Sequence, residues 1–177
     1  MLKILFLVLL NSAVVQAGVK SDELKTVDYV ELSKFAGTWY QIARKPVIFE
    51  RGCVCSRQTL TPMEDGKIAV LNTCNLQNPQ GKLASISGEA TVVDAKSNAK
   101  LKVDFGLPYK GDYWIIGLAP DYSWAIVTDP GDVSLYVLSK TPTLSELDYQ
   151  QAVTVAAQQR DVSVLTRTSQ EGCNYPE

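Results

Sequence analysis

The residues able to carry reaction chemistry are few, and they include four cysteines: Cys53, Cys55, Cys74 and Cys173. The sequence contains no histidine. This excludes Ser-His-Asp and Cys-His catalytic pairs, and zinc sites that use imidazole. A C-x-C pair with two distant cysteines does not match the common zinc spacings either. We therefore expect no metal site, no cofactor and no catalytic residue, and we predict a binding protein and not an enzyme.

The amino terminus has the pattern of a secretory signal peptide. A lysine at position 3 precedes an unbroken apolar run over residues 4–10, and Ala17 ends the segment as a small residue. The run is too short to span a bilayer, which needs about 20 residues; a buried N-terminal helix is the alternative. We predict a cleaved signal peptide over residues 1–17 and a single domain over residues 18–177, secreted or periplasmic. No lipid anchor is expected, because glycine and not cysteine follows the cut.

The composition is that of an ordinary globular domain. Of the 177 residues, 46% are hydrophobic and 20% are charged, and the net charge is −2. This balance gives no electrostatic reason to expect nucleic acid as a partner, and no later stretch is long and apolar enough for a transmembrane segment. In a secreted chain, an even number of cysteines indicates two disulfides.

The elements that must position these residues are short strands separated by turns, which is typical of an all-β barrel or sandwich. Thr143 and Glu146 fit a capping box, and they predict one helix that runs to about residue 160. We predict an eight-stranded antiparallel up-and-down β-barrel with this C-terminal helix packed outside and a short ninth strand. The expected strands are residues 38–45, 55–62, 67–74, 83–93, 100–105, 113–118, 124–127, 133–139 and 162–166.

Three short motifs occur in the order and spacing found in lipocalins. Residues 37–44 (GTWYQIAR) resemble the G-x-W-Y signature of the first lipocalin strand, residues 128–130 (TDP) resemble the second conserved region, and residues 138–140 (LSK) resemble the third. Residues 49–52 (FERG) narrow the resemblance to the branch of bacterial lipocalins and apolipoprotein D-like proteins. The resemblance implies a lipocalin (calycin) barrel whose floor is built structurally by Gly37, Trp39 and Lys140.

Strand alternation, together with the family alignment where strands are apolar on both faces, predicts which residues face the interior. No inward Arg or Lys is evident, which argues against a deeply buried ligand carboxylate. The alternative is that these side chains simply fill a small barrel. The residues predicted to bind the ligand are Gln41, Leu60, Ile68, Val70, Asn72, Ala90, Val103, Phe105, Tyr113, Ile115, Ala125, Val127, Tyr136 and Leu138. Val92 and Leu101 are predicted to face the interior as well.

The disulfide pairing is open to two interpretations. A hairpin folded back at Asp65-Gly66 brings Cys74 opposite residues 55–57, which favours Cys55–Cys74 and leaves Cys53 for Cys173. The family resemblance implies the other pairing, Cys53–Cys74 and Cys55–Cys173, which requires a bulge or bend near Gly52.

The resemblance implies a secreted protein that binds or transports a small hydrophobic ligand, such as a fatty acid or lysophospholipid. Two other functions are considered: a lipocalin-fold enzyme of the isomerase type that uses a cavity cysteine, and a protein-interaction module that uses the loop at residues 106–109. The expected partner is a small hydrophobic ligand or lipid. We also expect a monomer or weak dimer and transient contact with a membrane surface.

Overall fold

The computed structural model describes residues 24–175, so the predicted signal peptide over residues 1–17 lies outside the described residues. The helical elements are α1 (Leu32–Phe35), the 3₁₀ helix η1 (Ile48–Glu50) and α2 (Glu146–Ala157). The strands are β1 (Gly37–Arg44), β2 (Cys53–Pro62), β3 (Ile68–Leu76), β4 (Leu83–Val92), β5 (Lys100–Asp104), β6 (Gly111–Leu118), β7 (Trp124–Thr128), β8 (Leu135–Ser139) and β9 (Thr166–Arg167).

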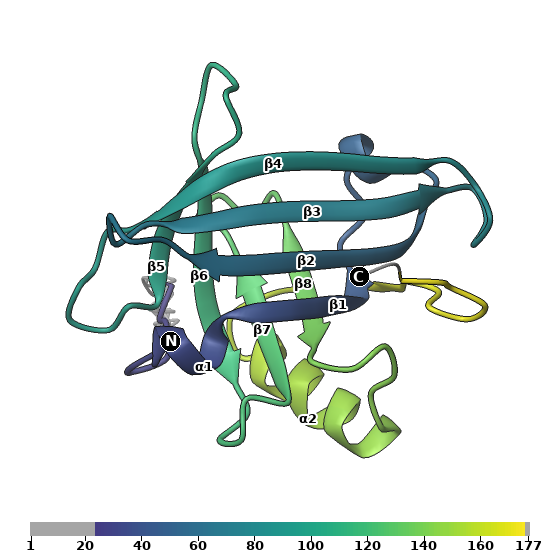
Figure 1. The fold of residues 1–177 in the computed structure, drawn as a ribbon. Helices are drawn as coiled ribbons and strands as arrows, with labels where there is room; N and C mark the ends of the chain where they lie inside the picture. Colours follow the sequence, from purple (N-terminus) through teal and green to yellow (C-terminus); the bar gives the residue numbers. More distant parts are fainter. Residues whose placement is uncertain (1–23, 176–177) are drawn as a thin grey trace, which may run out of the picture.

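The strands close into a barrel. Neighbours pair antiparallel in chain order from β2 to β8, and β1 pairs with β8 on one edge and with β2 on the other (Figure 1). The two-residue β9 pairs with Ala43 and Arg44, at the end of β1 that β2 no longer covers. The predicted eight-stranded barrel with one outer helix and a short ninth strand is confirmed.

Helix α2 lies outside the barrel, beside the strands that are apolar on both faces (Figure 1). Its buried residues Tyr149, Ala152 and Ala156 pack against outward side chains of β1, β6, β7 and β8. Gly117 allows this close approach, because a Cβ there would lie 2.9 Å from Val155 Cγ1. The inner faces of the barrel form a second cluster, which includes Phe35 of α1 and Trp39 of β1. Both faces of these strands are therefore covered, as their composition requires.

Successive antiparallel strands place alternate connections at the same end of the barrel. We call the end that carries α1 the floor, and it also has the connections at residues 63–67, 93–99, 119–123 and 140. We call the opposite end the mouth, and it has the connections at residues 45–52, 77–82, 105–110 and 129–134. Among residues 24–175, no helix is long and apolar enough to cross a membrane.

The predicted start of the helix was wrong. The capping residue is Ser145 and not Thr143, because Ser145 Oγ accepts a hydrogen bond from the backbone N of Asp148 at 3.1 Å. The Thr143 carbonyl instead accepts from Thr141 Oγ1 at 2.6 Å, within the preceding turn. The helix therefore begins at Glu146, and it ends at Ala157 instead of about residue 160.

Two predicted strands were also placed incorrectly. In the range 162–166, Leu165 N donates to Val162 O at 3.1 Å, which makes a turn. The short strand begins only at Thr166, where pairing with β1 starts. Strand β8 begins at residue 135 instead of 133, because the Asp129 carboxylate holds the backbone N–H groups of residues 133 and 134 in the preceding loop.

Candidate functional site

The barrel interior contains a small void of about 10 Å³, comparable with one water molecule. Two of its lining residues, Phe35 and Gln58, were not predicted. Gln58 was detectable, because it lies two residues before Leu60 and so shares its face of the strand. Phe35 comes from α1, which no sequence pattern indicated. The structure brings these two together with predicted inward residues Leu60, Ile68, Val70, Ala90, Leu101, Val103 and Tyr113.

A chain of polar side chains crosses this apolar wall. The Tyr113 hydroxyl donates to Gln58 Oε1 at 2.8 Å, and Gln58 Nε2 donates to Asn72 Oδ1 at 3.2 Å. Burial raises the pKa of Tyr113, so its phenol stays neutral and remains a donor. The chain satisfies polar groups that would otherwise be costly to bury, and it presents amide and hydroxyl groups to the interior.

The other predicted residues occupy the inner wall outside the void. Ile115, Ala125, Val127 and Leu138 belong to the interior cluster, and Phe105 and Tyr136 pack against it. Gln41 is buried, but its Nε2 donates to Thr168 Oγ1 at 2.9 Å. The amide donor of Gln41 is therefore engaged by the carboxy-terminal segment.

The expectation of no inward basic residue was wrong. A bulge in β1 between Gln41 and Ala43 shifts the register, so that Arg44 lies opposite the inward-facing Tyr136. Arg44 Nη1 lies 3.2 Å from Glu50 Oε2, and the Tyr136 hydroxyl donates to Glu50 Oε1 at 2.8 Å. Strand alternation alone could not predict this orientation, because one extra residue reverses the faces that follow it.

The same three residues form a partly buried polar group at the mouth, built on the Arg44–Glu50 ion pair. The side chains of Arg44 and Glu50 are 15% and 19% exposed. Burial raises the pKa of Tyr136, and the neighbouring Glu50 carboxylate raises it further. Tyr136 therefore remains a neutral hydrogen-bond donor beside an ion pair at the end of the barrel.

At the floor, Lys140 lies over the buried Trp39. Its Nζ is 4.3 Å from the centre of the indole, and it donates to the Phe35 carbonyl at 3.3 Å and to the Ala36 carbonyl. Trp39 Nε1 donates to the same Phe35 carbonyl at 2.7 Å. Gly37 lies beside this group: a Cβ atom at this position would be 3.7 Å from Lys140 Nζ.

The structure joins Cys53 to Cys74 and Cys55 to Cys173, the pairing that the family resemblance implies. The hairpin register changes between Val54 and Arg57, where β2 carries an extra residue. This bulge brings the Cα atoms of Cys53 and Cys74 to 5.4 Å. All four cysteines are therefore paired, and none is left as a thiol for the cysteine-based isomerase chemistry.

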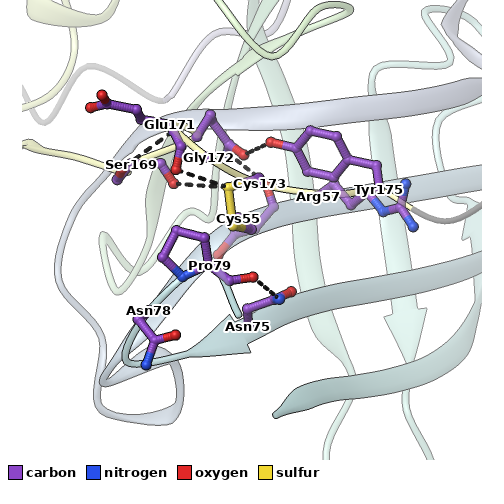
Figure 2. Close-up of a disulfide and its surroundings, with 12 residues drawn as sticks. Cys55, Arg57, Asn75, Asn78, Pro79, Ser169, Glu171, Gly172, Cys173 and Tyr175 are labelled. Carbon is purple, nitrogen blue, oxygen red and sulfur yellow. Dashed lines mark hydrogen bonds between the residues drawn. A yellow bond between two sulfur atoms is a disulfide. The ribbon is translucent and has the colours of Figure 1, made fainter. Parts of the chain in front are cut away.

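The second disulfide anchors the carboxy-terminal segment against the barrel (Figure 2). We call residues 166–173 the tail segment. Thr168 N donates to Ile42 O at 2.9 Å, and Cys55 N donates to Ser169 O at 2.9 Å. Gln170 Nε2 donates to carbonyls of both β1 and β2, at 2.8 and 2.9 Å. The tail segment thus bridges β1 and β2 where these strands no longer pair with each other.

Sequence comparison identifies relatives over most of the chain. A family model described as "Lipocalin-like domain" matches residues 30–170. Temperature-induced lipocalin-1 of Arabidopsis thaliana is 36% identical over 158 residues, which cover 84% of this chain and 83% of the relative. Outer membrane lipoprotein Blc of Escherichia coli K12 is 35% identical over 148 residues, which cover 82% of each chain. Rat apolipoprotein D is 41% identical over a shorter 100 residues, 55% of this chain and 50% of the relative.

Solved structures show the same fold at low sequence identity. Insecticyanin of the tobacco hornworm Manduca sexta superposes with a TM-score of 0.67 and 22% identity, covering 86% of this chain and 88% of the other. Lobster apocrustacyanin A1 gives a TM-score of 0.63 and 17% identity, covering 79% of each chain. With its barrel, its floor motif and this sequence match, the chain belongs to the lipocalin family, whose members bind small hydrophobic ligands.

Proposed function

We propose that this protein is a non-catalytic carrier that binds a small hydrophobic molecule, such as a fatty acid or lysophospholipid, inside its barrel. The observation that supports this most is the interior wall, where apolar side chains surround the polar chain of Tyr113, Gln58 and Asn72. A mostly apolar pocket with a few converging polar groups is the usual composition of a small-ligand site. The secretory pattern of residues 1–17 and the two disulfides support a secreted or periplasmic location.

The proposal assigns ligand contact first to the residues around the void. Each buried CH₂ of a ligand contributes about 0.8 kcal/mol, so an alkyl chain supplies most of the affinity. The void is much smaller than such a chain. Binding therefore requires side chains of the inner wall to move, and we expect entry from the mouth.

A titration with dansyl-labelled undecanoic acid tests this function. We expect saturable binding with one site per chain. Val70→Phe fills the void and should weaken binding at least about tenfold, while Leu71→Phe should stay within about twofold. Leu71 is the matched control, because it is the next residue on β3, faces outward and is 43% exposed. Equal affinity of the wild type and a folded Val70→Phe variant would show that the interior is not the site.

A second candidate function is transient contact with a membrane surface. The mouth connections expose large apolar side chains: Ile48 is 80%, Phe49 70%, Tyr109 74% and Val133 63% exposed. These side chains project from the end through which we expect the ligand to enter. A zwitterionic membrane fits this surface better than an anionic one, because the chain carries a net charge of −2.

A further inference from the structure

The group of Arg44, Glu50 and Tyr136 at the mouth contains a donor for which the described part of the chain provides no acceptor. Arg44 Nη1 and Nη2 both bind Glu50, the first at 3.2 Å to its carboxylate and the second at 3.0 Å to its carbonyl. Arg44 Nε is buried and has no hydrogen-bond partner among residues 24–175. A buried N–H of a charged group without an acceptor is costly, so this atom marks a place where an acceptor is missing.

The chemistry of that acceptor follows from the guanidinium. Arginine offers donors in a planar fork that matches the two oxygens of a carboxylate or the oxygens of a phosphate. Tyr136 adds a neutral hydroxyl donor, which now points at Glu50 Oε1. Two donors at the mouth, Arg44 Nη1 and the Tyr136 hydroxyl, therefore converge on one anionic group, and Glu50 supplies that carboxylate from within the chain.

The Glu50 side chain is placed so that the anionic group of a ligand can displace it. It is the last residue of η1, whose other two residues, Ile48 and Phe49, are strongly exposed. The turn itself is held by two backbone bonds, from Glu50 to Val47 and from Arg51 to Ile48, both 3.2 Å long. Movement of this short turn would expose the Glu50 carboxylate to water while Arg44 and Tyr136 remain on their strands.

We propose that Arg44 and Tyr136 bind the anionic head group of the ligand, a carboxylate or a phosphate, and that this head group displaces the side chain of Glu50. The alkyl chain of the ligand then extends from the mouth into the apolar interior. This inference rests on the proposed function, and it narrows the ligand class to single-chain amphiphiles with a negative head group.

The test compares three ligands with the same sixteen-carbon chain: hexadecanoic acid, hexadecyl phosphate and hexadecanol. Each displaces the neutral probe N-phenyl-1-naphthylamine from the wild type and from Arg44→Gln, Glu50→Gln and Arg51→Gln variants. Arg51 is the matched control, because it is an exposed arginine next to the same turn. The acid and the phosphate separate the two head-group chemistries, and the alcohol reports the contribution of the chain alone.

We expect Arg44→Gln to weaken binding of the acid, the phosphate or both by about tenfold or more, and to leave hexadecanol within about twofold. Glu50→Gln should strengthen binding of the same anions several-fold, because it removes the competing negative charge. Arg51→Gln should change nothing. The anion that responds to both variants identifies the head group.

Two results would overturn the inference while leaving the proposed function intact: equal loss of all three ligands in Arg44→Gln, or unchanged binding of all three. If Arg44→Gln does not fold, Glu50→Gln decides, and unchanged or weaker anion binding in that variant rejects the role of Glu50. Failure of every ligand to bind the wild type would instead reject the proposed function and this inference with it.

Discussion

At the scale of single residues, Lys140 shows how one side chain joins several parts of the floor. Its ammonium group contacts the face of Trp39 and two carbonyls at the end of α1. Burial lowers the pKa of Lys140. The indole face and the carbonyl dipoles act in the opposite direction, because they stabilise the charged ammonium form. Trp39 is itself fully buried, so this contact lies between the floor and the core.

Removing that contact should destabilise the fold. We predict that Lys140→Ala lowers the free energy of unfolding by about 1–2 kcal/mol, because it removes the cation from the indole and the hydrogen bond to the Ala36 carbonyl, while the Phe35 carbonyl keeps Trp39 Nε1 as a donor. Lys140→Arg should be neutral or stabilising, since the planar guanidinium also stacks on the ring. Urea unfolding followed by tryptophan fluorescence measures both, with the exposed Lys82→Ala as control. Identical unfolding midpoints for all variants would mean that the contact between Lys140 and Trp39 does not contribute to stability.

At the scale of elements, the tail segment completes an edge that the barrel strands leave incomplete. Strand β2 pairs with residues 37–40 of β1, and the tail segment covers the remainder of that edge through β9 and Thr168. Cys55 adopts a positive φ of 54° in the β2 bulge, and its backbone N–H donates to the tail segment. The disulfide and these hydrogen bonds therefore hold the same segment.

Cysteine substitutions test this arrangement. In Cys55→Ser we predict that Cys173 becomes reactive to a thiol reagent while Cys74 stays protected. The free energy of unfolding should fall by up to roughly 5 kcal/mol, because the lost disulfide joins residues 118 apart. The matched control is Cys53→Ser, which should expose Cys74 and leave Cys173 protected. Reactivity of Cys74 in the Cys55→Ser protein would contradict the pairing.

At the scale of the whole molecule, the two ends of the barrel have different chemistry. The floor is closed by α1 and by the Trp39–Lys140 contact, whereas the mouth combines the Arg44–Glu50 pair with exposed apolar side chains. From this difference between the two ends, we propose that a ligand enters and leaves at the mouth. We also propose that a membrane that supplies or receives the ligand touches the same end.

Flotation with phosphatidylcholine vesicles tests that orientation. We expect a fraction of the wild-type protein to float with the vesicles. The double substitution Ile48→Ser, Phe49→Ser should reduce the partition coefficient about tenfold or more, because burying each such side chain contributes about 1.5–3 kcal/mol. Leu147→Ser is the control, since Leu147 is 70% exposed but lies on α2. Equal flotation of all three proteins would reject membrane contact through the side chains of the mouth.

The sequence by itself determined the class of fold and most of the interior wall. Alternation with a period of two is a local property of each strand, so Leu60, Val70 and Val103 could be assigned to the interior without knowing their neighbours. The motifs around Trp39 and Lys140 likewise stand in the chain itself, and their order was enough to indicate the family.

Only the tertiary structure decided the residues whose orientation depends on a bulge or on a partner distant in sequence. The extra residue in β1 turns Arg44 toward Tyr136, and the extra residue in β2 brings Cys53 to Cys74. Alternation cannot predict a bulge, because the bulge is defined by the register of two paired strands. Phe35 entered the interior wall for a similar reason: a helix of four residues has too little periodicity to be detected, and its place is set by packing against Trp39.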